Sequence, residues 1–277
     1  MKYLYLPIAL LLLNCQSSKK ETTTSTDTTK IEQITSVDTL DIDLVALKDQ
    51  KLLGKTQIVE IKNDPVYHKD KRFNAVLFKD ILYKYSSVEN LNPAETKIIF
   101  ECEDGYKPEM PLNRLLDSES FLAISDADAP KGSDWEQIMK DGHEMKAAPF
   151  YLVYTNSQHH QSNEYQKPYN LVKVHFAPLH ENDAALRPKD ESAMVGYTLF
   201  KNRCQTCHAI NKIGGNMGPE LNYPKSVTEY WKTADLQAFI VNPASYRNEV
   251  KMPNLGIKPE ESAEIVKYLT YMSKHKL

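Results

Sequence analysis

The apolar and polar positions divide the chain into stretches of different character. A charged start, Met1-Lys2, is followed by a mostly apolar run from Leu4 to Leu13. Residues 16–37 are mainly Ser, Thr, Lys and Glu, with almost no apolar side chain before Ile31. A segment of this kind cannot bury enough apolar surface to fold. We therefore predict a flexible tether over 16–37 and folded structure from residue 38 onwards.

Short strands dominate the pattern between residues 38 and 180. Strand-like segments, rich in β-branched and aromatic residues, occupy 57–61, 97–102, 121–124, 149–154 and 169–176. Apolar residues at helical spacing predict a helix over 73–85 and a short one over 112–116. These elements indicate an α+β domain, mostly strand, of about 140 residues, which is long enough to form its own core.

The pattern becomes helical after a polar linker at 181–191. Residues 192–277 form the second predicted domain, which is all-α. A helix over 226–241 ends before Pro243, because the residue before a proline avoids the helical conformation. A last helix over 262–274 carries its apolar residues on one face. The acidic residues just ahead of that helix favour its N-terminus electrostatically.

The sequence Cys204-Gln205-Thr206-Cys207-His208 is typical of the attachment site of a c-type haem. Each thiol adds across a haem vinyl group, and His208 is placed to reach the iron from one face. The alternatives are a redox-active cysteine pair and half of a zinc site. Zinc needs four ligands, and only His275 follows as a further Cys or His. A Gly-rich loop, and not the helix of a redox motif, comes next. One covalent haem c is the predicted cofactor.

A second axial ligand is expected from the methionines that follow His208. Met217 lies in a short loop close to the motif, and Met272 lies within the last helical pattern. Met252 is 44 residues beyond His208, which is enough chain to reach the opposite face of a haem. Pro253 restricts the backbone of the loop that carries it. We predict Met252 as the ligand, and core packing is the alternative.

Residues 192–277 resemble a class I cytochrome c domain. The resemblance rests on Cys204–His208, Gly218-Pro219, Asn242-Pro243, Met252-Pro253 and a final helix. It implies that the Pro219 carbonyl accepts the imidazole N–H of His208, a contact that orients a metal ligand. It also implies a close crossing of the first helix, at Gly196 and Phe200, with the last helix near Tyr268 and Leu269.

Trp231, Tyr230 and Arg247 are candidates to hydrogen-bond the haem propionates, because buried carboxylates need donors. The alternative for the two aromatic residues is plain packing in the haem pocket.

The N-terminus resembles a bacterial lipoprotein signal that ends at Leu12-Leu13-Asn14-Cys15. Its apolar run is too short for a bilayer, which needs about 20 residues, and fits a secretory signal. Cleavage before Cys15 implies an acylated mature N-terminus and a membrane-anchored protein facing the periplasm or cell surface. Asn14 departs from the usual small residue. An ordinary signal peptide or an uncleaved anchor is the alternative.

The first domain weakly resembles the molybdopterin-binding fold of the sulfite oxidase family. The resemblance rests on Phe73–Val76 before Leu82, on Asp104-Gly105-Tyr106, and on Pro111-Leu112, Leu122-Ala123 and Pro168-Tyr169. That family holds molybdenum through a cysteine upstream of the helix expected near Phe73. Cys102 lies elsewhere and is predicted to be a buried thiol. We therefore expect no molybdopterin here.

Two further features of the first domain have modest interpretations. His159-His160 lies in a polar stretch and is expected to be exposed, with metal binding as the alternative. Trp135 is expected in a partly covered loop.

Charge is divided unevenly between the two domains. Residues 192–277 hold 11 Lys/Arg and 7 Asp/Glu, a balance of +4, whereas the whole chain is at −3. A mildly basic haem domain predicts docking to a redox protein with an acidic face. No basic cluster with interleaved aromatic residues indicates nucleic-acid binding.

An iron atom with two protein ligands leaves no position for a substrate. The expected function is therefore single-electron transfer by a membrane-tethered cytochrome between respiratory or periplasmic partners, with no catalytic residues. Two alternatives stay open. One is a sulfite-oxidase-like molybdenum enzyme with a haem relay, and the other is a haem-based redox sensor or assembly lipoprotein.

Overall fold

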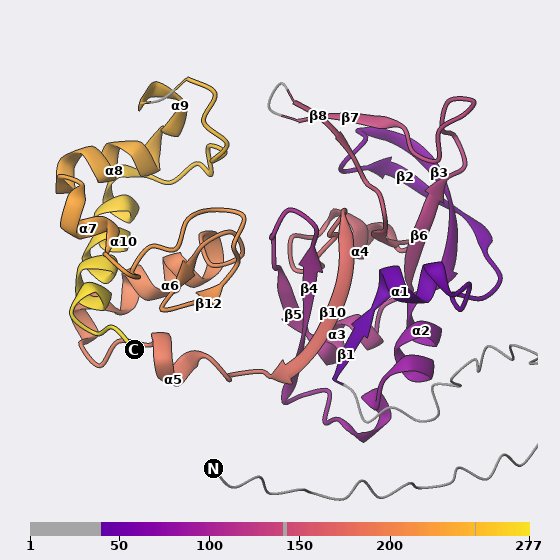
Figure 1. Cartoon of the computed structure of the whole chain (residues 1–277), viewed down its shortest axis with the longest axis horizontal. Helices are drawn as coiled ribbons and strands as arrows, with labels where there is room; N and C mark the ends of the chain where they lie inside the picture. The colour runs from indigo at the N-terminus through magenta and orange to yellow at the C-terminus, as the bar shows by residue number, and fades with distance from the viewer. Residues whose placement is uncertain (1–39, 141–142, 247) are drawn as a thin grey trace, which may run out of the picture. The chain divides into compact units, whose positions relative to one another are not determined.

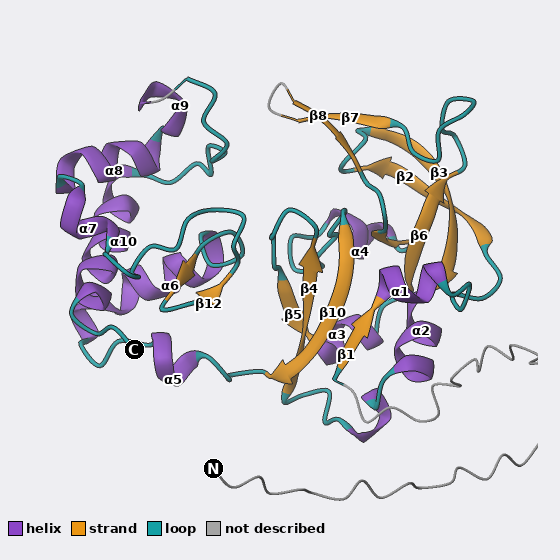
Figure 2. Ribbon diagram, in the orientation of Figure 1, coloured by secondary structure: helices purple, strands orange, loops and turns teal. Residues whose placement is uncertain are grey.

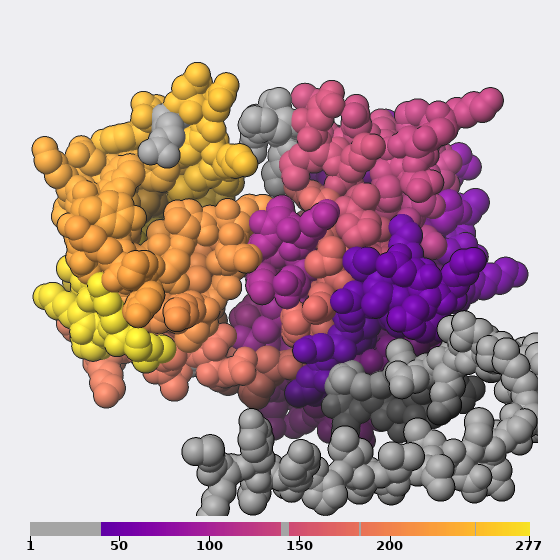
Figure 3. Space-filling model, in the orientation of Figure 1, coloured from indigo at the N-terminus to yellow at the C-terminus, as the bar shows by residue number. Residues whose placement is uncertain are grey.

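The computed structural model describes residues 40–140, 143–246 and 248–277. The predicted signal, Cys15 and the tether lie outside these residues, and so does Arg247. Figure 1 follows the described chain by residue number, Figure 2 separates its helices and strands, and Figure 3 shows the same residues as filled atoms.

The first domain consists of two four-stranded antiparallel sheets and a small hairpin. One sheet has the order β1-β10-β4-β5 and comprises Asp41–Asp43, Leu171–Pro178, Thr96–Cys102 and Glu109–Pro111. The other has the order β2-β3-β6-β9 and comprises Gln57–Asp64, Lys69–Leu77, Ser120–Asp126 and Tyr151–Tyr154. The hairpin pairs β7, Gln137–Lys140, with β8, His143–Lys146. Together with the helices below, this arrangement confirms the predicted mostly-strand α+β class.

Short helices complete the first domain. They are α1 (Leu44–Asp49), α2 (Phe78–Tyr85), the 3₁₀ turn η1 (Val88–Asn90), α3 (Leu112–Leu116) and α4 (Ser157–Gln161).

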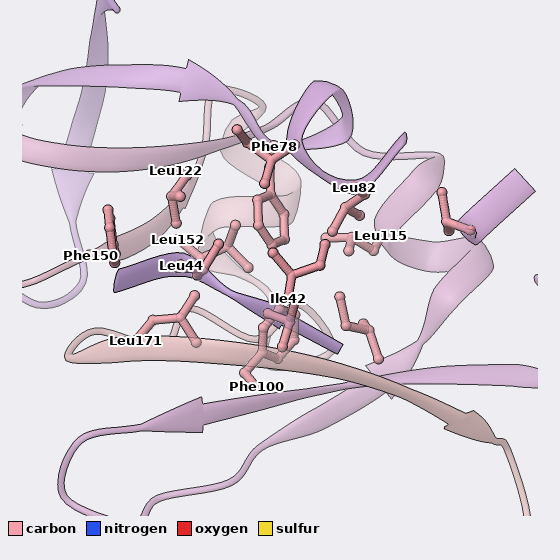
Figure 4. Packing of buried hydrophobic residues seen from close by; sticks show 14 of the residues in the cluster. Ile42, Leu44, Phe78, Leu82, Phe100, Leu115, Leu122, Phe150, Leu152 and Leu171 are labelled. Atoms are coloured by element: carbon pink, nitrogen blue, oxygen red, sulfur yellow. The ribbon is translucent and has the colours of Figure 1, made fainter. Parts of the chain in front are cut away.

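Strands β6 and β9 of the β2-β3-β6-β9 sheet are buried on both faces, because their alternate residues enter two different cores. On β9, Leu152 belongs to the core that includes α1, α2 and α3, whereas Val153 belongs to the core that includes the β7-β8 hairpin. Figure 4 shows the first of these cores, where Leu122, Phe100 and Phe150 converge from different elements. A strand buried on both faces has a continuous apolar sequence instead of an alternating one.

The predicted helix over 73–85 is wrong in its first half. Residues Lys69–Leu77 form β3, and only Phe78–Tyr85 is helical. Strand β3 pairs with β2 on one side and β6 on the other, so its backbone groups are satisfied in the sheet. Phe73 and Ala75 are fully buried in one core while Val76 enters the other. This long-range pairing overrides the local helical spacing.

His159 and His160 are not in an exposed loop. They lie in α4, which Asn156 caps by accepting a hydrogen bond from the Gln158 amide. The His159 ring stacks on Tyr165 with centroids 4.1 Å apart. His160 is 2% exposed. The polar composition of the loop concealed this burial.

Trp135 is also more deeply buried than expected. It is 4% exposed and packs on Phe73 with ring centroids 6.2 Å apart.

The second domain is a set of helices around one apolar core. The helices are α6 (Met194–Arg203), α7 (Val227–Tyr230), α8 (Thr233–Val241), α9 (Pro243–Tyr246) and α10 (Pro259–Ser273). The expected helix over 226–241 is split in two at Trp231 and Lys232. Pro243 opens the short α9, a position that proline tolerates because it needs no amide donor there.

The predicted crossing of the first and last helices is confirmed. A Cβ atom on Gly196 would lie 2.0 Å from the Glu264 carbonyl oxygen of α10 and 2.7 Å from the Cβ of Tyr268. The rings of Phe200 and Tyr268 pack with centroids 5.6 Å apart. Only glycine lets the two backbones approach this closely, so Gly196 sets the position of α6.

The segment between the domains contributes to the second core. It contains α5 (Asp183–Leu186) and the 3₁₀ turn η2 (Glu191–Ala193). Leu186 is 1% exposed in the core of the second domain, and its carbonyl accepts a hydrogen bond from the Tyr268 hydroxyl at 2.8 Å. Asp190 caps η2 by accepting a bond from the Ser192 amide. None of the helices in the described ranges is long and apolar enough to cross a membrane.

The buried His160 makes the first domain sensitive to acid. Burial is the largest influence and lowers its pKa, with Lys167 acting in the same direction and Asp64 opposing it. The folded chain therefore keeps His160 neutral while the unfolded chain takes up a proton near pH 6.5. The contribution of His160 to the free energy of unfolding is therefore fully present above about pH 6.5 and is lost as the pH falls. We expect His160→Leu to reduce the loss of unfolding free energy between pH 7 and pH 5 by about 1 kcal/mol.

The measurement is denaturant unfolding followed by far-ultraviolet circular dichroism at both pH values. His180→Gln, at an exposed histidine, is the control for the removal of a histidine from the surface of the chain. An equal loss in His160→Leu and the unmodified chain would contradict the assignment.

Candidate haem-attachment site

The Cys204–His208 segment folds into one compact turn at the end of α6. The last turn of the helix carries over into Cys204, whose amide donates to the Phe200 carbonyl at 2.8 Å. The Cys204 carbonyl in turn accepts the amides of Cys207 at 3.0 Å and of His208 at 2.8 Å. Both thiols and the imidazole are therefore placed on this one turn, which follows directly from α6.

The chain then folds back across the motif. Ala209–Ile210 and Ile213–Gly214 pair as the short strands β11 and β12. The Gly215 amide donates to the Gln205 carbonyl, and the Gly218 amide donates to the Cys207 carbonyl, both at 2.8 Å. The Gly-rich loop that distinguished this motif from a redox cysteine pair thus holds the attachment turn from outside.

The imidazole of His208 is oriented by the backbone. Its Nδ1 lies 2.8 Å from the Pro219 carbonyl oxygen, which is the contact expected from the cytochrome resemblance. Because a carbonyl only accepts, the hydrogen is on Nδ1 and the Nε2 lone pair is available to a metal. Burial lowers the pKa of His208, although the Pro219 carbonyl opposes this shift. A neutral, oriented imidazole is the form that ligates iron.

Gly218 lies against the face of this ring. A Cβ atom at Gly218 would be 2.3 Å from Cε1 and 2.8 Å from Nε2 of His208. The site therefore has no room for a side chain at position 218. The oriented imidazole, the two thiols and the absence of a side chain at position 218 fit the covalent attachment of a haem.

Glu220 anchors the segment that carries Pro219, and sequence reasoning missed it. One carboxylate oxygen, Oε1, accepts the amides of Asn211, Asn222 and Tyr223 at 2.8–3.0 Å. The other, Oε2, accepts the Lys212 amide at 2.8 Å. The only available signal was a lone acidic residue directly after Gly218-Pro219.

Asn222 ties this segment to the last helix. It is 1% exposed, and its side-chain amide donates to the Met272 carbonyl and to Asn211 Oδ1.

The Cys204 thiol does not have the character of the reactive thiol in a redox-active pair. Burial raises the pKa of Cys204 to about 12, with a smaller contribution from Cys207. A redox-active cysteine needs the opposite shift, toward the thiolate. Both cysteines are half-buried, and neither is in a disulfide. In the described ranges no group of three or more His, Cys, Asp or Glu side chains is arranged to hold a metal ion.

The other predicted site residues lie on the α7–α10 side of the domain. Trp231 packs on Phe239, with ring centroids 5.2 Å apart, and on Tyr246 at 6.3 Å. Met252 is half-buried in the loop between α9 and α10. Met272 is 2% exposed in the helical core and Met217 is 46% exposed. Met272 is therefore a packing residue, as the helical pattern predicted.

The helical fold and the attachment turn define a c-type haem domain. A family model described as cytochrome c matches residues 193–273. The chain is 32% identical to cytochrome c of Chlamydomonas reinhardtii over 93 residues, which are 27% of this chain and 83% of that protein. It is 31% identical to cytochrome c of Theileria parva over 107 residues, 32% of this chain and 91% of that protein. It is 28% identical to cytochrome c of Guizotia abyssinica over 96 residues, 28% and 86% of the two chains.

The chain belongs to the cytochrome c family through its second domain. It is a haem-based electron carrier with covalently bound haem c. The family match leaves the first domain, and its resemblance to the sulfite oxidase fold, outside its range.

The requirement for glycine at position 218, next to the His208 ring, can be tested by substitution. In Gly218→Ala the added methyl group must displace the His208 ring or the loop, and such overpacking costs about 1–3 kcal/mol of stability. We expect weaker haem-domain stability and a changed haem absorption spectrum, measured by denaturant unfolding and visible spectroscopy. Gly132→Ala is the control for the spectrum: its φ of +89° brings backbone strain, but a Cβ there meets nothing within 4 Å and lies outside the haem domain. A haem spectrum in Gly218→Ala that matches the spectrum of Gly132→Ala would show that position 218 does not affect the His208 ring.

Proposed function

We propose that this chain is a membrane-tethered c-type cytochrome that passes single electrons between redox proteins at an exported membrane surface. The observation that carries the proposal is the His208 Nδ1 contact to the Pro219 carbonyl within the Cys204–His208 turn. That contact leaves Nε2 directed to a metal, with both thiols on the same turn.

In this proposal Cys204 and Cys207 hold the haem through thioether bonds, and His208 is one axial ligand. Met252 is the other, since its loop follows α9 and its side chain is half-buried. Trp231 belongs to the pocket wall, where its contacts with Phe239 and Tyr246 support a packing role. Arg247 is retained as a candidate propionate donor. The haem supplies a reversible one-electron couple whose potential a Met/His pair raises.

The surrounding residues hold the His208 ligand and the two thiols in fixed positions. Glu220 and Asn222 keep the Pro219 segment in place, and through the Pro219 carbonyl this segment would hold the orientation of the His208 ring toward a bound haem. The α6–α10 crossing fixes the turn that carries the thiols. A site whose ligands do not move loses and gains an electron with little reorganisation. No proton acceptor or substrate position is needed.

The tether and the partners follow from sequence features. Acylation at Cys15 anchors the chain to a bacterial membrane, facing the periplasm or cell surface, and residues 16–37 extend it from the bilayer. The positive balance of residues 192–277 favours a partner with an acidic docking face. The first domain positions the haem domain for that partner.

The proposal predicts one iron and no molybdenum per chain. The full chain, expressed with haem-maturation machinery and with molybdenum supplied, should also titrate as a single reversible one-electron couple. Metal analysis and potentiometry measure both quantities. Stoichiometric molybdenum would contradict the electron-carrier proposal and support an enzyme with a haem relay. A chain without iron would contradict the proposal altogether.

The ligand role of Met252 has its own test. Met252→Leu conserves volume but removes the thioether sulfur, so the iron loses its sixth protein ligand. We expect the potential to fall by a sizeable part of the roughly 0.8 V range that axial ligands control. Met217→Leu, at an exposed methionine, is the matched control and should leave the potential unchanged. Identical potentials in the two variants would show that Met252 is not a ligand of the iron.

A further inference from the structure

A tight turn of the first domain lies against the haem-attachment loop of the second. The turn is Glu103–Lys107, between β4 and β5. The Gly105 amide donates to the Cys102 carbonyl at 2.9 Å, and the Cys102 amide donates to the Tyr106 carbonyl at 3.0 Å. The Asp104 side chain accepts the Tyr106 amide at 3.0 Å. These bonds are all within the first domain, so the turn has a defined shape of its own.

Two main-chain hydrogen bonds join this turn to the attachment loop. The Lys107 amide donates to the Thr206 carbonyl at 2.9 Å, and the Asn216 amide donates to the Gly105 carbonyl at 3.0 Å. One bond runs in each direction, and the two bonds reach different segments of the attachment loop. Thr206 lies between the two haem-attachment cysteines, and Asn216 lies in the Gly-rich loop that folds over them. The turn thus contacts both the Cys204–His208 motif and the Gly-rich loop that folds over it.

Gly105 is required at this contact for two separate reasons. Its φ of +85° is one that side chains rarely adopt. In addition, a Cβ atom there would lie 2.1 Å from Asn216 Oδ1 and 2.9 Å from the Asn216 carbonyl carbon. A side chain at position 105 is therefore incompatible with the observed approach of the two segments.

Tyr106 brings a large side chain to the same place. Burial raises its pKa well above the ordinary tyrosine range, and the nearby Cys207 thiol is the second contributor. The phenol therefore stays neutral, and it lies close to one of the two thiols that hold the haem.

Charged side chains of both domains, among them Glu101, Lys201 and Lys212, line a cleft of about 350 Å³ beside the turn. The two backbone bonds and the close approach at Gly105 are the contacts that a side chain at position 105 would disrupt.

We propose that the Glu103–Lys107 turn is a built-in cover of the haem-attachment loop. It keeps water from the Cys207 side of the site and occupies an approach that an external redox partner would otherwise use. The first domain is then itself the partner seated on this face, and external donors and acceptors dock elsewhere on the haem domain. This inference rests on the proposed cytochrome function.

Hydrogen exchange of the full-length haem protein tests the contact. The Lys107 and Asn216 amides donate only across it in the structure, so both should be protected in the unmodified chain. In Gly105→Ala their exchange should accelerate about tenfold or more, since the contact opens locally. The Gly218 amide, bonded within the haem domain, should be unaffected. Protection that is already absent in the unmodified chain would overturn the inference.

Gly54→Ala is the matched control. Gly54 has a φ of +86°, nearly that of Gly105, but a Cβ atom there meets nothing within 4 Å. It therefore carries the same backbone strain without the collision, and both amides should stay protected. Asn216→Ala combined with Gly105→Ala removes the nearest colliding atom and should partly restore protection. Equal acceleration in Gly54→Ala would mean that strain alone, and not docking, controls the exchange.

The haem potential tests the consequence of the contact. Because solvent exposure tunes haem potentials, we expect a lower midpoint potential in Gly105→Ala, with Gly54→Ala unchanged. Faster reduction by a small hydrophilic reductant should accompany it. If the chain binds one haem but Gly105→Ala changes neither the potential nor the reduction rate, the cover proposal is refuted and the electron-carrier proposal still stands. A chain without haem would instead refute the underlying function.

Discussion

The close crossing of α6 and α10 at Gly196 is the constraint on which the rest of the haem domain depends. The crossing fixes the end of α6, where Cys204 begins the attachment turn. From there the loop returns over the motif and presents the Pro219 carbonyl to His208. A side chain at position 196 would force the helix axes apart and move the thiols together with the imidazole. A single absent methyl group therefore controls the geometry of the site.

The polar contacts around the site act as supports for this geometry. Glu220 collects four backbone amides, and Asn222 connects their segment to the carbonyl of Met272 on α10. A partly buried carboxylate with several amide donors is well satisfied, whereas one without them would be costly. The same helix thus positions both the beginning of the attachment turn and the segment that orients its histidine. This shared dependence explains how a small helical domain keeps its iron ligand rigid.

The first domain follows a different physical logic. Strands β6 and β9 of its β2-β3-β6-β9 sheet lie between two cores, which gives them continuous apolar stretches. Local spacing predicted β4, α3, β6, β9 and β10 close to their observed positions, because each is bounded by turn residues. It failed for residues 73–77, where pairing with two neighbouring strands decided the conformation. It also failed for His160, whose burial depends on elements distant in the sequence.

The sequence by itself determined the chemistry of the second domain, because haem attachment needs a contiguous set of residues. Cys204, Cys207 and His208 lie within five consecutive positions, and the proline and helices that accompany them are also local signals. Tertiary structure alone decided which distant groups meet. Glu220 as an amide acceptor, Leu186 in the haem-domain core and Gly105 against Asn216 all depend on contacts between separated segments. Such contacts leave no periodic trace in the sequence, since they are set by the packing of whole elements and not by neighbours along the chain.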